Sequence, residues 1–155
     1  AQSQTWSLGF LLLGALICVL ALLVLRSPLL DERPAVRADS TRVWEDYSPA
    51  RLEALRAAGT PVFVNVTADW CITCLANEKI ALSSGEVLAA FRDRGIVYLK
   101  GDWTNSDPEL TALLQAHGRS GVPLYLFYPA TTGAPATLLP QLLTPSIVLE
   151  TIGAH

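Results

Sequence analysis

Cys71 and Cys74, separated by two residues, are the side chains in this sequence best suited to chemistry. They lie in the stretch ADWCITC, directly after the β-branched run PVFVNVT at 61–67. A cysteine pair of this kind can exchange a disulfide, supply half of a zinc site, or be buried in the core. A closed zinc site needs four ligands, and His117 and His155 lie far along the chain without ligand spacing. We therefore expect no metal at this pair.

The residues around the pair favour redox chemistry over simple burial. Two core cysteines would not need Trp70 and the end of a strand just before them. The pattern predicts a helix from about Cys71 to Leu82, and the free N–H groups and dipole at a helix start stabilise a thiolate. Cys71 would then attack a disulfide, and Cys74, one turn further in, would resolve the mixed disulfide. The spacing permits a bond between the two sulfurs.

The elements that must position this pair alternate along the chain. Ser48 followed by Pro49, and Thr144 followed by Pro145, mark helix starts. Within 61–67 the run is apolar except at Asn65, as expected for a central strand covered on both faces. The expected helices are 48–59, 71–82, 85–95, 106–118 and 144–155, and the expected strands are 61–67, 96–102, 121–129 and 136–143. This order predicts an α/β sandwich.

The N-terminal part has a different character. Trp6 to Leu25 is a run of 20 residues without a charge, long enough at 1.5 Å per residue to span roughly 30 Å of hydrocarbon. A signal peptide is the alternative, but no basic segment precedes the run and Arg26 ends it. We expect a transmembrane helix at 1–26, a linker at 27–42 and the α/β domain at 43–155.

Composition narrows the classes of partner. The net charge is −3 and no basic stripe interleaves with aromatic residues, which argues against nucleic acid. Apolar residues make up 51% of the chain and charged residues 16%, in keeping with a membrane segment. No sequence pattern indicates a bound cofactor, so none is expected.

Three stretches together resemble a known family. TADWCITC followed by a Glu-Lys pair, the loop GDWTNSDPEL, and GRSGVPLYLFY are similar to the C-terminal thioredoxin-like domain of the DsbD/ScsB group of membrane thiol:disulfide interchange proteins. The resemblance covers roughly residues 43–154. The apolar helix before it resembles the last transmembrane helix of that family's central domain, so the chain is expected to be a C-terminal piece of a larger protein.

The resemblance implies a thioredoxin-like fold and an electron relay. Electrons would pass from a transmembrane donor domain of the same protein to this domain, and then to periplasmic thiol-disulfide proteins. Cys71 would be the nucleophile and Cys74 the resolving cysteine, while Trp70, Val122 and Pro123 would contact the substrate. The Val122–Pro123 bond is expected to be cis and to lie against the pair.

The implied location is the bacterial inner membrane with this domain in the periplasm. The arginines just after the apolar run favour a cytoplasmic domain instead by the positive-inside rule. Helices further upstream would set the orientation of a larger protein, so we follow the resemblance.

At one position the sequence also departs from the thioredoxin pattern. Thioredoxins carry a buried acid six residues before the first cysteine, where this chain has Asn65. Glu78 matches an acid of the family and shares a helix face with Cys74, so it could handle that thiol's proton. Alternatively, Glu78 is a solvated residue that pairs with Lys79 or another neighbour. Trp103 is expected either to line the groove beside the pair or to pack in the core.

Two other functions remain open at this level. One is a non-catalytic thioredoxin-like module that binds a client or carries copper on its dithiol. The other is an independently anchored thioredoxin that serves cytochrome c maturation, a part of cytochrome c biogenesis.

Overall fold

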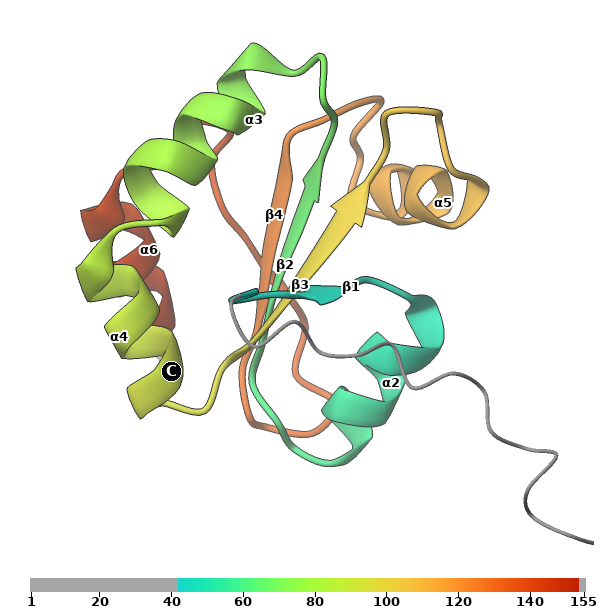
Figure 1. The fold of residues 1–155 in the computed structure, drawn as a ribbon. Helices are drawn as coiled ribbons and strands as arrows, with labels where there is room; N and C mark the ends of the chain where they lie inside the picture. Colours follow the sequence, from blue (N-terminus) through green and yellow to red (C-terminus); the bar gives the residue numbers. More distant parts are fainter. Residues whose placement is uncertain (1–41, 154–155) are drawn as a thin grey trace, which may run out of the picture. The chain divides into compact units, whose positions relative to one another are not determined.

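A five-stranded sheet is the frame of the domain in the computed structural model, which describes residues 42–153 (Figure 1). The strand order is β1-β3-β2-β4-β5. The strands are β1 (Glu45–Asp46), β2 (Val62–Thr67), β3 (Val97–Asp102), β4 (Leu124–Tyr128) and β5 (Thr137–Leu138). β3 runs parallel to β1 and β2, whereas β4 runs antiparallel to β2 and β5. The expected transmembrane helix at 1–26 and nearly all of the linker lie outside the described residues.

Helices cover both faces of this sheet. They are α2 (Pro49–Ala57), α3 (Ile72–Asn77), the π-helix η2 (Glu78–Leu82), α4 (Gly85–Asp93), α5 (Pro108–Ala116) and α6 (Pro145–Gly153). In Figure 1, α3, α4 and α6 lie on one side of the sheet and α2 and α5 on the other. Between residues 42 and 153, no helix has the length and apolar character needed to cross a membrane.

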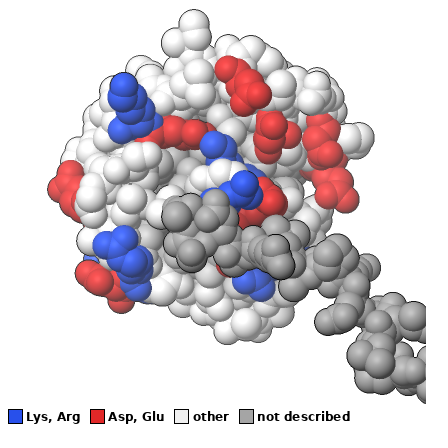
Figure 2. Space-filling view, viewed as in Figure 1, with Lys and Arg blue, Asp and Glu red and all other residues white. Residues whose placement is uncertain are grey.

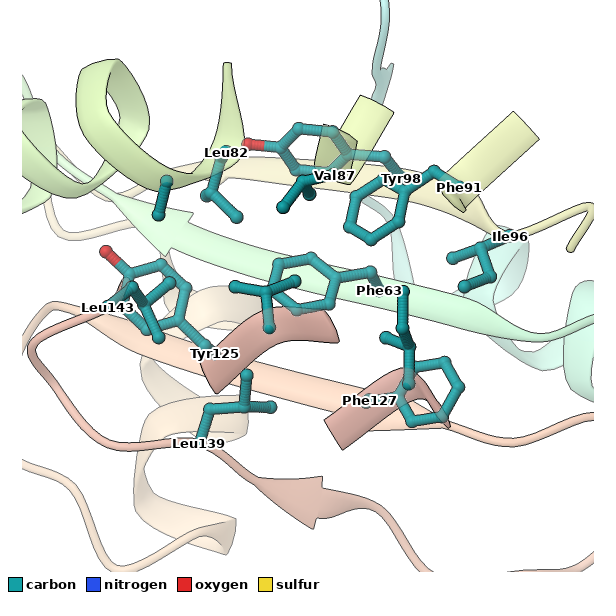
Figure 3. Packing of buried hydrophobic residues seen from close by; sticks show 13 residues of the cluster. Phe63, Leu82, Val87, Phe91, Ile96, Tyr98, Tyr125, Phe127, Leu139 and Leu143 are labelled. Atoms are coloured by element: carbon teal, nitrogen blue, oxygen red, sulfur yellow. The ribbon is translucent and has the colours of Figure 1, made fainter. Parts of the chain in front are cut away.

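The predicted α/β sandwich is therefore observed, with a hydrophobic core on each face of the sheet. β2 is buried along its whole length, as expected for the central strand. On the α3, α4 and α6 side, Phe63 packs between Tyr98 and Tyr125, with ring centroids 5.9 and 6.4 Å away (Figure 3). The other face holds mainly leucine and valine beneath α2 and α5.

The helix caps follow the sequence signals closely. Ser48 accepts a hydrogen bond from the Arg51 N–H, and Thr144 accepts one from Ile147. For α5 the cap is Asp107, whose side chain accepts from the Leu110 N–H. These side chains satisfy N–H groups that have no partner inside the helix.

Some boundaries differ from the prediction. The strand expected at 121–129 is confined to Leu124–Tyr128, because Pro123 has no N–H to add to the ladder. The strand expected at 136–143 shrinks to Thr137–Leu138, since Pro140 interrupts it and the following residues turn to α3 instead. β1 was not predicted at all.

The helix expected from Cys71 to Leu82 also changes its hydrogen-bond register part-way. It is α-helical to Asn77 and continues as the π-helix η2 from Glu78. Single π-turns inside helices are frequent at functional sites. Here the change of register begins at the acid that the sequence singles out.

Charges of both signs are interspersed on the face shown in Figure 2, which is viewed as in Figure 1. Long-range steering of a highly charged partner needs a surface dominated by one sign. The face in view is not dominated by one sign of charge.

Candidate active site

The two cysteines form a disulfide at the start of α3. Their sulfurs are 2.03 Å apart and their Cα atoms 5.2 Å apart. Cys71 is the N-cap of α3, and its sulfur accepts a hydrogen bond from the Cys74 N–H at 3.2 Å. Cys71 keeps 7% of its surface exposed, whereas Cys74 is fully buried. Cys71 is therefore the more exposed cysteine of the pair.

The Val122–Pro123 bond is cis, as predicted. Val122 packs against a small buried cluster of Ala68, Cys71 and Cys74, and Pro123 is buried beside it. The sheet explains this arrangement, because Val66 near the end of β2 pairs with Leu124 at the start of β4. The residues that follow β2 and those that precede β4 thus meet at the disulfide.

Trp70 is held by the loop after β3. Its indole N–H donates to the Thr104 carbonyl at 3.2 Å, and the Asp69 N–H donates to the Thr104 hydroxyl at 2.9 Å. Asp102 fixes Thr104 by accepting from its side chain and its N–H, and these bonds hold the pKa of Asp102 below its usual value. Trp70 remains 58% exposed, so its ring is fixed in direction but open to a partner.

Trp103 takes the core-packing role, one of the two that the sequence left open. It is half-buried against the α5 side of the core, and its indole N–H donates to Thr111 at 2.8 Å. Its ring centroid is 6.1 Å from that of Trp70. Trp103 therefore supports Trp70 from the core side.

Several exposed apolar side chains lie close to Cys71 along the chain. Trp70, Ile72 and Leu75 are 58%, 81% and 49% exposed, and all three lie within four positions of Cys71 along the chain. Contiguous exposed apolar side chains mark surfaces that bind other proteins. Such a surface suits docking of a polypeptide that carries its own disulfide.

Glu78 lies where the cysteine helix continues as η2, and its carboxylate contacts the sheet instead of being fully solvated. One carboxylate oxygen accepts from Lys100 Nζ at 2.8 Å, and the other accepts from Asn65 Nδ2 at 3.0 Å. Only 20% of the Glu78 side chain is exposed. Its ionic partner is Lys100 on β3, not the adjacent Lys79.

Asn65 connects Glu78 to the interior. It is fully buried, and its amide group also donates to the Tyr98 hydroxyl at 3.0 Å. Its Oδ1 is, among the described buried side-chain atoms, the one without a hydrogen-bond partner. Burial raises the pKa of Tyr98, and the charge of Glu78 adds to that rise. A neutral amide thus stands where thioredoxins have an acid.

Sequence reasoning missed Lys100 and Asn77 as parts of this site. Lys100 is the Cα partner of Asn65 across β2 and β3, a register that no local motif reveals. Asn77 is buried and binds the Tyr125 hydroxyl, the Gln141 carbonyl and the Leu143 N–H. It appears polar and unremarkable in the sequence, because its partners lie far along the chain.

A family model described as thioredoxin-like matches residues 43–130. The chain belongs to the thioredoxin-like family. It is 39% identical over 75 residues to the thiol:disulfide interchange protein DsbD of Klebsiella pneumoniae, covering 48% of this chain and 12% of that protein. It is 29% identical over 122 residues to DsbD of Yersinia enterocolitica, covering 74% of this chain and 21% of that protein.

A solved structure agrees with this family. The oxidised C-terminal domain of DsbD from Neisseria meningitidis superposes with a TM-score of 0.54 at 25% identity, over 69% of this chain and 95% of that domain. The chain spans only a small part of the length of the curated relatives it matches, 12% and 21% in these two cases. Homology and the CxxC disulfide together support a DsbD-type thioredoxin-like domain with protein-disulfide oxidoreductase activity.

Proposed function

We propose that this chain is the membrane-tethered C-terminal part of a larger thiol:disulfide interchange protein. Its Cys71–Cys74 pair would receive electrons from a transmembrane donor domain of the same protein and deliver them to periplasmic disulfide proteins. Residues 1–26 would cross the inner membrane, 27–42 would be the linker, and 43–155 would be the redox domain. The observation that carries the proposal is the disulfide at the start of α3, set among exposed apolar side chains.

The first half of the reaction uses Cys71. In the reduced domain its thiolate attacks a disulfide of the partner, so that a Cys71–partner disulfide forms and the other partner sulfur leaves as a thiolate. The leaving thiolate takes up a proton from solvent. Trp70, which is exposed, and Val122, which packs on the cysteines, would position the partner chain.

The second half uses Cys74. Its thiol must lose a proton before it can attack the Cys71 sulfur, and burial disfavours the charged thiolate. Glu78, one helical turn further on, is the acceptor we propose. The Cys74 thiolate then forms the intramolecular disulfide and releases the second partner sulfur. Two electrons have passed from the pair to the partner, and a donor dithiol reverses these steps to restore the reduced pair.

Turnover tests the redox function. The wild-type chain should reduce a protein disulfide such as insulin with a dithiol as donor, and Cys71→Ser should abolish this activity. A non-catalytic or copper-carrying module would bind its ligand without turnover. Between residues 42 and 153 no group of three or more His, Cys, Asp or Glu is placed to hold a metal ion, so a copper carrier would rely on the two thiolates.

Trapping tests the relay. In cells, Cys71 of the Cys74→Ser variant can still attack a partner's disulfide, including that of an oxidised donor, but no resolving sulfur remains, so the mixed disulfide should accumulate. A bond to another cysteine of the same, longer polypeptide supports the relay. A bond to a separate donor protein would instead favour an independently anchored thioredoxin and contradict the relay.

The proton acceptor is tested by Glu78→Gln. We expect resolution by Cys74 to slow by about a hundredfold or more, within the range for loss of a general base, while attack by Cys71 is largely unchanged. Stopped-flow kinetics over a pH series separate the two steps. Unchanged rates and pH profiles would show that Glu78 does not take the proton.

A further inference from the structure

A cavity of about 430 Å³ opens along the β3 side of the cysteine helix, and we call it the side groove. Its walls come from the segment between β2 and α3, from the cysteine helix, from β3 and from the start of the described chain. Besides Glu78, they include Trp44, Ala68, Asp69, Leu75, Lys100 and Asp102. These six side chains have no part in the exchange steps proposed above, so the groove can serve another purpose.

The side groove is continuous with the site of exchange. Ala68 lies in its wall and also belongs to the small buried cluster of the two cysteines. Asp69 and Leu75, which line it as well, are two residues before and four residues after Cys71. Val122 precedes β4, which lies on the other side of β2 from β3. A partner chain that bonds to Cys71 and runs on away from Val122 therefore enters the side groove.

The charged side chains in the walls of the side groove do not balance. Its two basic residues each pair with an acid of the same groove, Lys100 with Glu78 and Arg42 with Asp46. The two other acids of the walls, Asp69 and Asp102, form no ion pair with any described residue. The groove thus carries negative charge that the described part of the chain does not compensate.

The sheet brings these two acids to the same end of the domain. Asp102 is the in-register partner of Thr67 across β3 and β2, and Asp69 follows Thr67 by two residues. Both acids are exposed. Hydrogen bonds from Thr104 lower the pKa of Asp102, so that this carboxylate is ionised at neutral pH. A cation that reaches the groove beside the cysteine helix would meet both carboxylates.

The side groove already holds one guanidinium, which belongs to the chain itself. The guanidinium carbon of Arg42 lies 4.3 Å from the centre of the Trp44 ring, and its Nη1 lies 3.6 Å from Asp46. Guanidinium groups favour this combination of an aromatic or apolar surface with a carboxylate. At the cysteine end, Leu75 and Asp69 offer the groove a second apolar side chain and a second exposed carboxylate.

We propose that the side groove binds the segment of the redox partner that flanks its reactive cysteine, and that it selects a segment carrying an arginine or a lysine. The inference rests on the proposed function and names the chemistry of the partner. The basic side chain would lay its methylene stem along Leu75 and bring its charge to Asp69 and Asp102. A glutamate in its place would meet two uncompensated carboxylates and be rejected.

The experiment uses the full chain, reduced and kept in an uncharged detergent. Each probe is a short neutral peptide whose one cysteine is joined in a disulfide to the coloured thiol of DTNB. Cys71 attacks the peptide sulfur, a Cys71–peptide disulfide forms, and the coloured thiolate leaves. An arginine, glutamine or glutamate stands at one position, from three residues before the cysteine to three after it. Stopped flow gives each rate constant, which is divided by that for dithiothreitol to remove the effect of the peptide's own charge.

We expect at least one position at which the arginine peptide reacts about three- to fivefold faster than the glutamine peptide at low salt, the size expected of an exposed ion pair. High salt should reduce this preference. Asp69→Asn should lower it to about twofold or less, and Asp69→Lys should reverse it in favour of glutamate. The control Glu150→Gln removes one exposed acid on α6, outside the walls of the groove, and should keep the preference.

An arginine-to-glutamine ratio close to one at every position in the wild type would overturn the proposal. A preference that Asp69→Asn leaves at the wild-type value would also overturn it, because the charge of the groove would then not be its source. Each ratio compares two peptides on the same protein, so a change in the reactivity of Cys71 cancels. Failure of the proposed function has a different signature, since the wild type would then not reduce insulin with a dithiol donor.

Discussion

Cys71 and Cys74 differ in their access to solvent, and this difference supports the roles proposed for them. Cys71 caps α3 and keeps part of its surface exposed, while Cys74 is sealed beneath it. A partner sulfur is therefore expected to meet Cys71 before Cys74, which is fully buried. The order of events follows from burial.

This order predicts an asymmetry between serine variants. Cys74→Ser should accumulate a mixed disulfide with a protein substrate, because the resolving sulfur is missing, whereas Cys71→Ser should accumulate none. Non-reducing gels after acid quenching measure the adducts. Equal trapping by the two variants would mean that the roles are assigned wrongly.

The contacts of Asn65 explain why a neutral residue suits this position. An acid at this position would meet the Glu78 carboxylate, because the Asn65 amide now donates to it at 3.0 Å. Two carboxylates in contact repel each other and share a proton. The amide avoids that conflict and leaves one acid in the network.

We therefore predict that Asn65→Asp makes Cys71 harder to ionise. The added negative charge should raise the pH at which half of Cys71 reacts with iodoacetamide by about one pH unit. Stability should also fall as both carboxylates ionise. Asn65→Ser, which adds no charge, is the control, and an alkylation profile of Asn65→Asp identical to that of the control would contradict the prediction.

At the scale of elements, Asn77 joins the cysteine helix to the segment that leads into α6. Its side chain is buried and makes three hydrogen bonds, to the Tyr125 hydroxyl, the Gln141 carbonyl and the Leu143 N–H. Because of these hydrogen bonds, the residues after β5 run alongside α3 and do not extend the strand.

Asn77→Ala should destabilise the fold by about 2–4 kcal/mol, since it leaves buried polar groups without partners. Urea unfolding of the oxidised chain measures this loss. Asn105→Ala, at an exposed loop position, should change stability by less than about 0.5 kcal/mol. Equal effects of the two changes would show that the contact does not hold the segment.

The packing of α5 on β3 depends on Gly101. A Cβ at this position would lie 2.5 Å from a methyl carbon of Leu110, closer than packed atoms tolerate. Gly101→Ala should therefore cost about 1–3 kcal/mol by overpacking. Gly85→Ala, where a Cβ has open space, should be neutral or stabilising by up to about 1 kcal/mol. Urea unfolding compares the two, and an unaffected Gly101→Ala would mean that α5 moves freely.

For the molecule as a whole, titratable groups whose pKa values change on folding set the pH range of stability. Burial lowers the pKa of His117, and the Thr104 hydrogen bonds lower that of Asp102. Both groups therefore contribute stability above their unfolded pKa values that is lost as the pH falls. Burial raises the pKa of Tyr47 and Tyr125 to about 12, so their contribution is present below the unfolded value and is lost as the pH rises.

Stability should accordingly be greatest between about pH 7 and pH 10, and should fall below about pH 6 and again above about pH 10. Urea unfolding at a series of pH values measures the profile. His117→Gln should weaken the fall near pH 6, and Tyr125→Phe the fall at high pH. A His117→Gln profile that follows the wild type on the acid side would remove His117 as the cause.

The sequence by itself determined the chemistry and the type of fold. The CxxC pair after a covered strand, the cap residues and the alternation of apolar runs are local patterns, and local patterns are set by spacing along the chain. They predicted the disulfide partners, the helix starts at Ser48 and Thr144, and the central position of β2. The resemblance further predicted the cis bond at Val122–Pro123.

Only the tertiary structure decided what surrounds the pair. Lys100 reaches Glu78 because β3 lies in register beside β2, and Asn77 finds its partners because the chain returns to α3 after β5. Contacts of this kind join residues that are distant in sequence, so no local spacing encodes them. Glu78 is thus recognisable from its position after Cys74, whereas its ionic partner follows from the packing of strands.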